Sequence, residues 1–355
     1  MTQFIQLHLL TAYPPANLNR DDLGRPKTAI IGGTERLRIS SQSLKRAWRC
    51  SELFESALGE FKGTRTKRLG EQVLQRLLDK GMQKNKARKI AVAIAGVFGK
   101  NKKEDNKDTP EIEQLAHISP EEWQAVFDLV DTLAAEDREP ENDKLALLRH
   151  TPKAVDIALF GRMLAASPAF NVEAAAQVAH AISVNTVKIE DDYFTAVDDL
   201  NTHKEDSGAG HVGDAGFGSG IFYQYLCINR DQLVENLQGD EALVNRAIRA
   251  LTEAAAKVAP TGKQNSFASR AYTSYLLAEK GSHQPRSLSV AFFSAVDSKN
   301  PMKAAIETLE AQRDKFDQVY GACADKRCAM NADSGQGSLE AILDFVASDK
   351  DCGDD

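Results

Sequence analysis

The chain has 355 residues, a formal net charge of −7 and a pI of about 5.6. This length can bury a substantial core and hold two domains. No apolar stretch approaches the roughly 20 residues of a membrane-spanning helix, so we expect no membrane partner. The overall acidity argues against an obvious nucleic-acid binder.

The first sixty residues predict a strand, a loop, a second strand end and a helix. Apolar residues alternate over 3–12, which is typical of a half-buried strand that Pro14 and Pro15 would end. Residues 13–35 are loop-rich. The alternation then returns at Arg36, and Ser40 or Ser41 stands where the N-cap of a helix over 42–61 belongs.

Residues 36–49 concentrate five cations, three serines and one glutamine. Unpaired N–H groups and the positive dipole end at a helix N-terminus suit a phosphate oxygen. Lys45 and Arg49 lie four residues apart, on one helix face. The segment therefore predicts a phosphate-binding strand–turn–helix, with a merely solvated basic helix start as the alternative.

Residues 62–180 are expected to be almost entirely helical, with helices near 71–80, 84–97, 120–135 and the alanine-rich 171–181. Charge divides sharply within this region. Residues 61–103 carry thirteen Lys or Arg against two acids, a net of +11, and residues 104–150 have a net charge of −10. The split indicates a basic surface for a polyanion, or a helical hairpin whose solvated sides differ in sign.

Strand character returns after about residue 182. Glycines crowd residues 201–220 and predict a protruding arm, and their GxGxxG match at 208–213 lacks the following helix of a dinucleotide site. We expect a strand at 221–229, a helix at 241–258, a strand at 266–277, and helices near 288–297 and 301–320. The order predicts an α+β sheet of ferredoxin or RRM type with long insertions.

Residues with chemical potential are few. The five cysteines lack metal-ligand spacing and are expected to be reduced thiols, and we expect no structural metal and no cofactor. The aspartate pairs at 21–22, 191–192 and 198–199 could hold Mg²⁺ for phosphodiester cleavage, or serve as caps, turns and salt bridges. Phe194 and Met163 could stack on or wedge between bases, or fill the core.

Six stretches together resemble the repeated backbone subunit of the type I-E CRISPR surveillance complex Cascade, the CasC family. They are LNRDD (18–22), RISSQSLKRA (38–47), VDIALFGRM (155–163), AHAIS (179–183), FTAVDDL (194–200) and SGIFY (219–223). The resemblance implies an RRM-like palm from residues 1–57, 181–189 and 223–355. A helical fingers insertion would span 58–180, and a β-hairpin thumb 190–222.

The same resemblance implies a non-catalytic, cytoplasmic protein of antiviral defence. Copies would stack head to tail along a CRISPR RNA (crRNA) guide, kink it at regular intervals and present it to target DNA, beside other Cascade subunits. The implied RNA-binding residues are Arg20, Lys27, Arg38, Ser40, Gln42, Lys45, Arg46, Arg49, Met163 and Phe194. Charge alone suggests DNA contacts from Lys84, Lys86, Lys100, Lys102 and Lys103.

Two alternatives stay open. The first is a metal-dependent ribonuclease, because related backbone subunits of type III complexes cut RNA with a loop aspartate, and Asp21 or Asp22 falls in a comparable early loop. The second is an unrelated α+β enzyme, which would purify free of nucleic acid as a monomer or dimer.

Overall fold

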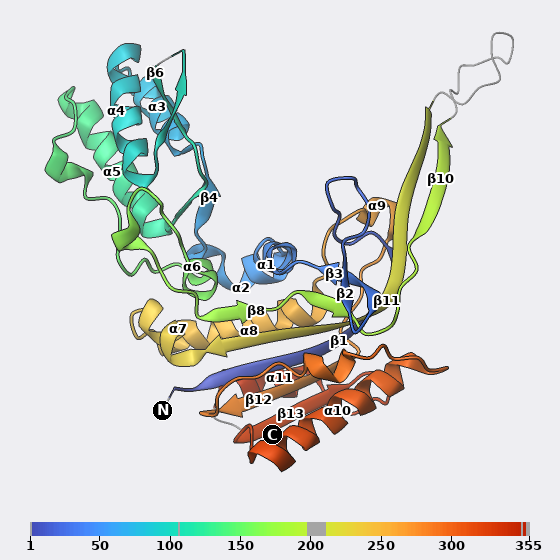
Figure 1. Ribbon diagram of the computed structural model, residues 1–355. Helices are drawn as coiled ribbons and strands as arrows, with labels where there is room; N and C mark the ends of the chain where they lie inside the picture. Colours follow the sequence, from blue (N-terminus) through green and yellow to red (C-terminus); the bar gives the residue numbers. More distant parts are fainter. Residues whose placement is uncertain (1, 106, 197–210, 349–350, 353–355) are drawn as a thin grey trace, which may run out of the picture.

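The computed structural model describes residues 2–105, 107–196, 211–348 and 351–352. The protein is a mixed α+β structure built on one large sheet, and two arms rise from opposite ends of that sheet (Figure 1). One arm is mainly helical, and the other is a long β-hairpin. In the described part of the chain, no helix is long and apolar enough to cross a membrane.

The large sheet has nine strands in the order β13-β12-β1-β11-β9-β3-β2, and β8 and β10 also pair with β11. Every pairing is antiparallel. The strands are β1 (Phe4–Ala16), β2 (Thr28–Ile31), β3 (Thr34–Ile39), β8 (Ala176–Val178), β9 (Ala181–Ser183), β10 (Glu190–Ala196), β11 (His211–Asn229), β12 (Tyr275–Gly281) and β13 (Lys326–Asn331).

Helices cover both faces of the sheet (Figure 1). Because side chains alternate along a strand, Ile5, Leu7 and Leu9 enter the core shared with one set of helices, while Leu10 faces the other set. The first set is α1 (Ser41–Arg49), α2 (Glu52–Leu58), α6 (Val155–Phe160), α7 (Arg230–Asn236), α8 (Glu241–Lys257) and α11 (Leu339–Ala347). The second is η4 (Ser289–Phe292) and α10 (Pro301–Tyr320).

The helical arm has a hydrophobic core of its own, formed by side chains between Leu69 and Leu164. Its elements are η1 (Gly59–Phe61), β4 (Thr64–Thr66), α3 (Leu69–Asp79), α4 (Lys84–Phe98), β5 (Asn101–Glu104), β6 (Lys107–Ile112), β7 (Ala116–Ile118), α5 (Pro120–Glu136) and η2 (Asn142–Leu145). The arm corresponds to the predicted fingers and the β10–β11 hairpin to the predicted thumb, and the domain boundaries stay predictions. The remaining short helices are η3 (Pro168–Phe170) and α9 (Gln264–Phe267).

Several predicted elements are confirmed and others need correction near the N-terminus. The helices expected near 71–80, 84–97, 120–135, 241–258 and 301–320 are present. The single helix expected over 42–61 is wrong, because Ser51 accepts the backbone N–H of Phe54 and starts a second helix. The first strand does not end at Pro14 and Pro15, since β1 continues through a register shift between Tyr13 and Ala16.

The helix predicted over 171–181 is also wrong. Residues there form β8 and β9, which pair with β11. Ala175, Ala176 and Ala181 are buried against neighbouring elements, so small size and tertiary pairing override the helix propensity of alanine. Strands β4 to β7 likewise contradict the expectation of an almost wholly helical segment.

The expected protruding loop over 201–220 is only partly described, and its second half is strand. Residues 211–220 begin the 19-residue strand β11. A Cβ on Gly213 would lie 2.6 Å from the Phe194 ring, and one on Gly218 would lie 3.2 Å from Leu37. The glycines therefore permit close approach rather than a loop. The strand predicted over 266–277 starts only at Tyr275, and the helix near 288–297 is the short η4.

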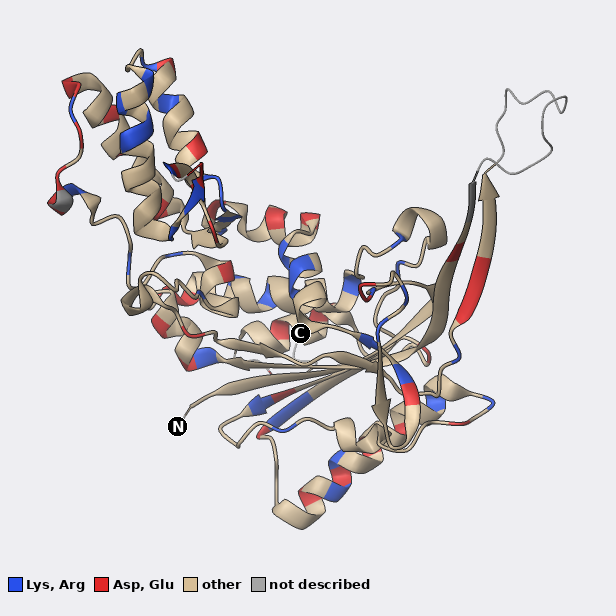
Figure 2. Cartoon of the chain, turned by 45° about the horizontal axis from the view of Figure 1, so that its top comes forward, with Lys and Arg blue, Asp and Glu red and all other residues tan. Residues whose placement is uncertain are grey.

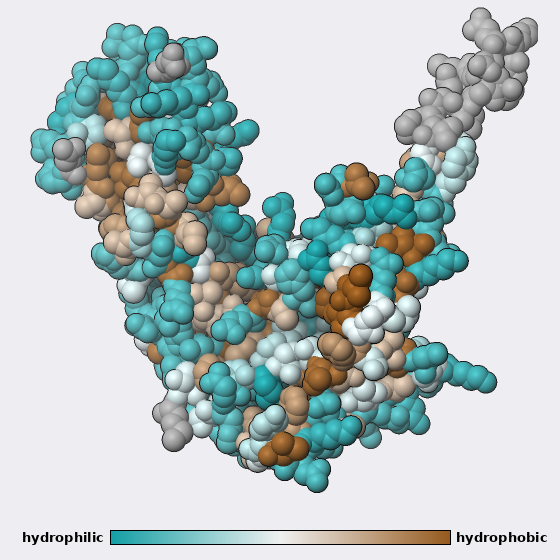
Figure 3. Space-filling view, in the orientation of Figure 1, coloured by the Kyte–Doolittle hydropathy of each residue, from teal (hydrophilic) through white to brown (hydrophobic). Residues whose placement is uncertain are grey.

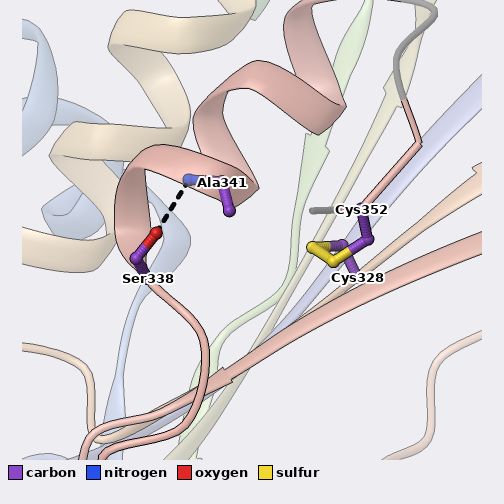
Figure 4. Close-up of a disulfide and its surroundings, with 4 residues drawn as sticks. All are labelled: Cys328, Ser338, Ala341 and Cys352. Atoms are coloured by element: carbon purple, nitrogen blue, oxygen red, sulfur yellow. Dashed lines mark hydrogen bonds between the residues drawn. A yellow bond between two sulfur atoms is a disulfide. The ribbon is translucent and has the colours of Figure 1, made fainter. Parts of the chain in front are cut away.

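The expectation of five reduced thiols is wrong. Cys328 on β13 forms a disulfide with Cys352, with Cα atoms 5.2 Å apart (Figure 4). The bridge lies near the start of α11, where the Ser338 hydroxyl accepts the Ala341 N–H at 3.1 Å. The partners are 24 residues apart, and their pairing is set by the return of the chain after α11. Cys50, Cys227 and Cys323 are free.

Candidate nucleic-acid interface

The predicted strand–turn–helix is present where β3 leads into α1. The Ser40 hydroxyl accepts the Ser43 N–H at 3.3 Å, which confirms Ser40 as the N-cap. Asn19 from the preceding loop accepts the Ser40 N–H at 2.8 Å and fixes the turn. Gln42 and Arg46 on the helix are exposed, and Figure 2 shows the cations of α1 on the side of the sheet from which both arms rise.

Lys45 lies on the same helix, half-buried, with its ammonium 5.8 Å from the centroid of the Phe160 ring. Burial lowers the pKa of Lys45, and the nearby charge of Arg65 on β4 lowers it further. No carboxylate of the described chain pairs with either cation. Sequence reasoning missed Arg65, because its only signal was membership of the long basic run.

A second group of basic side chains surrounds Arg38 of β3. The Arg38 guanidinium donates to Nδ1 of His180 at 2.9 Å and to the Thr28 carbonyl at 3.4 Å. Burial lowers the pKa of His180, and the charges of Arg38 and Lys27 add to that effect. Within the described residues, no carboxylate pairs with any member of this Arg38–Lys27–His180 group. Arg36, by contrast, is fully buried and donates to the carbonyls of Ser183 and Val184.

Arg49 has a different environment from the other predicted RNA contacts. Its guanidinium donates to Asp156 at 3.0 Å and to the Gly63 carbonyl at 3.4 Å. Asp156 is fully buried and also accepts from Gly63 N and from His117 Nε2, each at 2.8 Å. Burial opposes ionisation, but the bonds from His117 and Gly63 and the charge of Arg49 lower the pKa of Asp156. This cluster joins α1 to the base of the fingers.

The two predicted wedge residues stand on different arms. Met163 follows α6 near the base of the fingers and is 82% exposed. Phe194 lies on β10 opposite Gly213 of β11, and its ring is partly exposed at 42%. Phe194 is not among the residues of the hydrophobic cores found in the described chain, and its roles as a wedge or as an anchor of the hairpin both stay predictions.

The predicted DNA-binding lysines of the fingers divide into two kinds. Lys86 pairs with Asp137 at 2.9 Å and Lys100 pairs with Glu113 at 2.9 Å. Lys102 pairs with two glutamates, and the hydrogen bond that it donates to Glu111 is the main cause that raises its pKa. Lys84 and Lys103 make no ion pair with any described residue.

The early loop with the aspartate pair lines a cavity of about 520 Å³, together with Arg20 and Ser43. Asp21 accepts the backbone N–H groups of Leu23 and Arg25 and so holds its own turn. Among the described residues, no three His, Cys, Asp or Glu side chains form a cluster able to hold a metal ion. Asp191 pairs with Arg25 at 3.1 Å. The Asp198–Asp199 pair, the thumb tip and Gly208 of the GxGxxG match lie outside the described residues.

Comparison with known proteins places the chain in a family. Residues 5–346 match the family model of the CT1975-like protein. The chain is similar to a solved structure described as a CRISPR RNA-guided surveillance complex, pre-nicking, at 29% identity and a TM-score of 0.82, covering 97% of this chain and 99% of that one. It is also similar to a second CRISPR RNA-guided surveillance complex chain, at 25% identity and a TM-score of 0.73, covering 98% and 100%.

No curated protein matched the chain. The structural matches confirm the resemblance to a Cascade backbone subunit, while the assignment to type I-E stays a prediction. Because the family model spans nearly the whole sequence, the chain belongs to the CT1975-like protein family.

Proposed function

We propose that this protein is the guide-RNA-binding backbone subunit of a type I-E CRISPR surveillance complex, acting in the cytoplasm in antiviral defence. One observation carries the proposal. Two groups of cations, Lys45 with Arg65 and Arg38 with Lys27, each act on one small region without an ion-pairing carboxylate in the described chain. Like charges held close repel each other, and an anion placed among them relieves that repulsion. A phosphate chain supplies such anions in series.

The sheet supports an RRM-like palm. The strands β12-β1-β11-β9 are neighbours in that order, with α1 and α2 between β1 and β9 in sequence and α8 between β11 and β12. This is the βαββαβ order of a ferredoxin-like fold, with the fingers inserted after the first helices. The helices α2 and α8 pack together on one face of the sheet.

The exposed apolar residues support repetition along one guide. Met163 on one side and Phe194 on the other could wedge between bases where successive copies meet. Figure 3 shows a hydrophobic patch over the β2–β3 edge of the sheet, where Ile30 is 80% exposed and Phe293, beside the β2–β3 turn, is 63% exposed. An open strand edge with apolar side chains is a typical contact surface between protein chains.

We propose that target DNA contacts the fingers through Lys84 and Lys103, which have no anionic partner among the described residues, and that other Cascade subunits cap the assembly. We also propose a scaffold rather than an enzyme. Asp21, the candidate nuclease residue, already accepts two N–H groups of its own loop.

The test is to express the chain with its crRNA and neighbouring complex subunits, purify the assembly and extract its nucleic acid. We expect stoichiometric RNA of defined length in an assembly with several copies of the chain. A monomer or dimer that is free of nucleic acid would overturn the proposal.

A further inference from the structure

We propose that binding of a guide phosphate at Arg38 is coupled to the uptake of one proton by His180. The inference rests on the proposed RNA-binding function and assigns a proton-linked step to the same site. It concerns three residues, Arg38 on β3, His180 just before β9, and Lys27 just before β2.

The hydrogen bond between Arg38 and His180 fixes the protonation state of the free protein. Register brings them together, because β3 pairs with β9 through Arg38 and Ile182. The guanidinium can only donate hydrogen bonds, and its Nη1 lies 2.9 Å from Nδ1 of His180. Nδ1 must therefore offer a lone pair, and the imidazole is neutral with its proton on Nε2.

The surroundings of His180 contain positive charge and lack a compensating negative charge. The charged groups that act on the ring are Arg38 and Lys27, and both disfavour the imidazolium. No carboxylate in the described ranges forms an ion pair with any of the three residues. His180 is nevertheless exposed, so a phosphate in solution can reach it.

Nδ1 of His180 thus accepts a hydrogen bond from Arg38 that a phosphate oxygen could accept instead. When the phosphate arrives, Arg38 donates to its oxygen instead of to Nδ1, and the freed nitrogen accepts a proton from solvent. The imidazolium and the guanidinium then both donate to the anion. The only covalent change is the new Nδ1–H bond, whose proton leaves a hydronium ion or a buffer acid. The phosphate raises the pKa of His180, so by linkage the RNA binds more tightly as pH falls.

The first measurement is the affinity of the purified subunit for a fluorescently labelled single-stranded RNA at pH 6 and pH 8, at constant ionic strength. One linked proton can change affinity by at most about tenfold per pH unit, and we expect roughly tenfold tighter binding at pH 6. His180→Gln keeps an acceptor for Arg38 but cannot take up a proton, so its affinity should change much less with pH.

Two further variants separate proton uptake from a packing role. His180→Lys carries its charge at both pH values, so it should bind tightly at both; weaker binding than His180→Gln at pH 8 would contradict the inference. The matched control is His283→Gln, because His283 is an exposed palm histidine bonded to Asp325. It should keep the full pH dependence of the unmodified protein.

Calorimetry in two buffers of different ionisation enthalpy gives a direct count of protons. We expect uptake of up to one proton per bound subunit near neutral pH, and none in His180→Gln. RNA binding with equal pH dependence in the unmodified protein and His180→Gln would overturn the proton linkage and leave the RNA-binding proposal intact. Failure to bind RNA at any pH would instead overturn the proposed function.

Discussion

Lys45 and Arg49 lie one turn apart on α1, yet their surroundings differ completely. Lys45, with Arg65 beside it, faces no carboxylate of the described chain, whereas Arg49 donates to the buried Asp156. The fingers repeat the contrast, since Lys100 and Lys102 are paired and Lys84 is unpaired within the described residues. A cation that is paired with a carboxylate must break that ion pair to bind a phosphate. Whether a Lys or Arg is ion-paired therefore predicts phosphate binding better than the number of positive charges in a segment does.

The largest expected effect is on stability, at the ion-paired Arg49–Asp156 cluster. Asp156→Asn leaves Arg49 and His117 without their carboxylate in a buried site, which should lower the free energy of unfolding by about 3 kcal/mol. Asp131→Asn, which removes an exposed partner of Arg76, should cost less than about 1 kcal/mol. Urea unfolding measures both free energies. Equal losses would show that the buried cluster contributes no more to stability than the exposed Arg76–Asp131 ion pair.

The same cluster predicts a pH dependence. Because the pKa of Asp156 is lowered in the folded protein, its contribution to stability is present above the unfolded-state pKa of about 4 and is lost as pH falls through the folded value. Asp156→Asn should therefore flatten the acid limb of the stability curve. An unchanged acid limb would mean that other carboxylates cause the loss of stability at low pH.

Substitution of the cations without a carboxylate partner in the described chain, Arg38 and Lys45, should lower RNA affinity and leave stability unchanged. Arg38→Ala with Lys45→Ala removes two of the proposed phosphate contacts, and at about 1.4 kcal/mol each the affinity should fall roughly 100-fold. The slope of log affinity against log salt should lose about 0.7 for each contact. Lys100→Ala with Lys102→Ala removes the same charge from paired positions and serves as the control. Equal losses from both pairs would contradict the prediction from ion pairing.

A single-residue comparison sharpens this further. Lys45→Met should weaken RNA binding by about tenfold and leave thermal stability unchanged. Arg49→Met should lower the thermal stability and leave RNA affinity unchanged, because it removes one partner of Asp156. Weaker RNA binding by Arg49→Met, with stability retained, would support Arg49 as a contact to the guide backbone. Filter binding and calorimetric unfolding of the same preparations decide between these outcomes.

Local signals account for what the sequence predicted correctly. Ser40 directly precedes a helical run, so its capping role could be predicted from neighbours alone. Arg49 and Asp156 are 107 residues apart, and Arg38 and His180 are 142 apart, so their pairing depends on how β9 and α6 return to the sheet. The alanines of β8 and the glycines of β11 misled for the same reason, since packing against distant strands decided their conformation.

The smallest expected effect concerns the fingers and target DNA. Lys84→Ala with Lys103→Ala should weaken DNA binding by the assembled complex by a few fold, because exposed lysines contact phosphates through well-screened charge. Lys100→Ala with Lys102→Ala should change it less, since Glu113 and Glu111 already neutralise those lysines. The difference should shrink at high salt, where screening removes the advantage of an unpaired charge. A salt-independent difference would indicate a shape change of the fingers instead, which the β5–β6 hairpin that carries Lys102 and Lys103 could transmit.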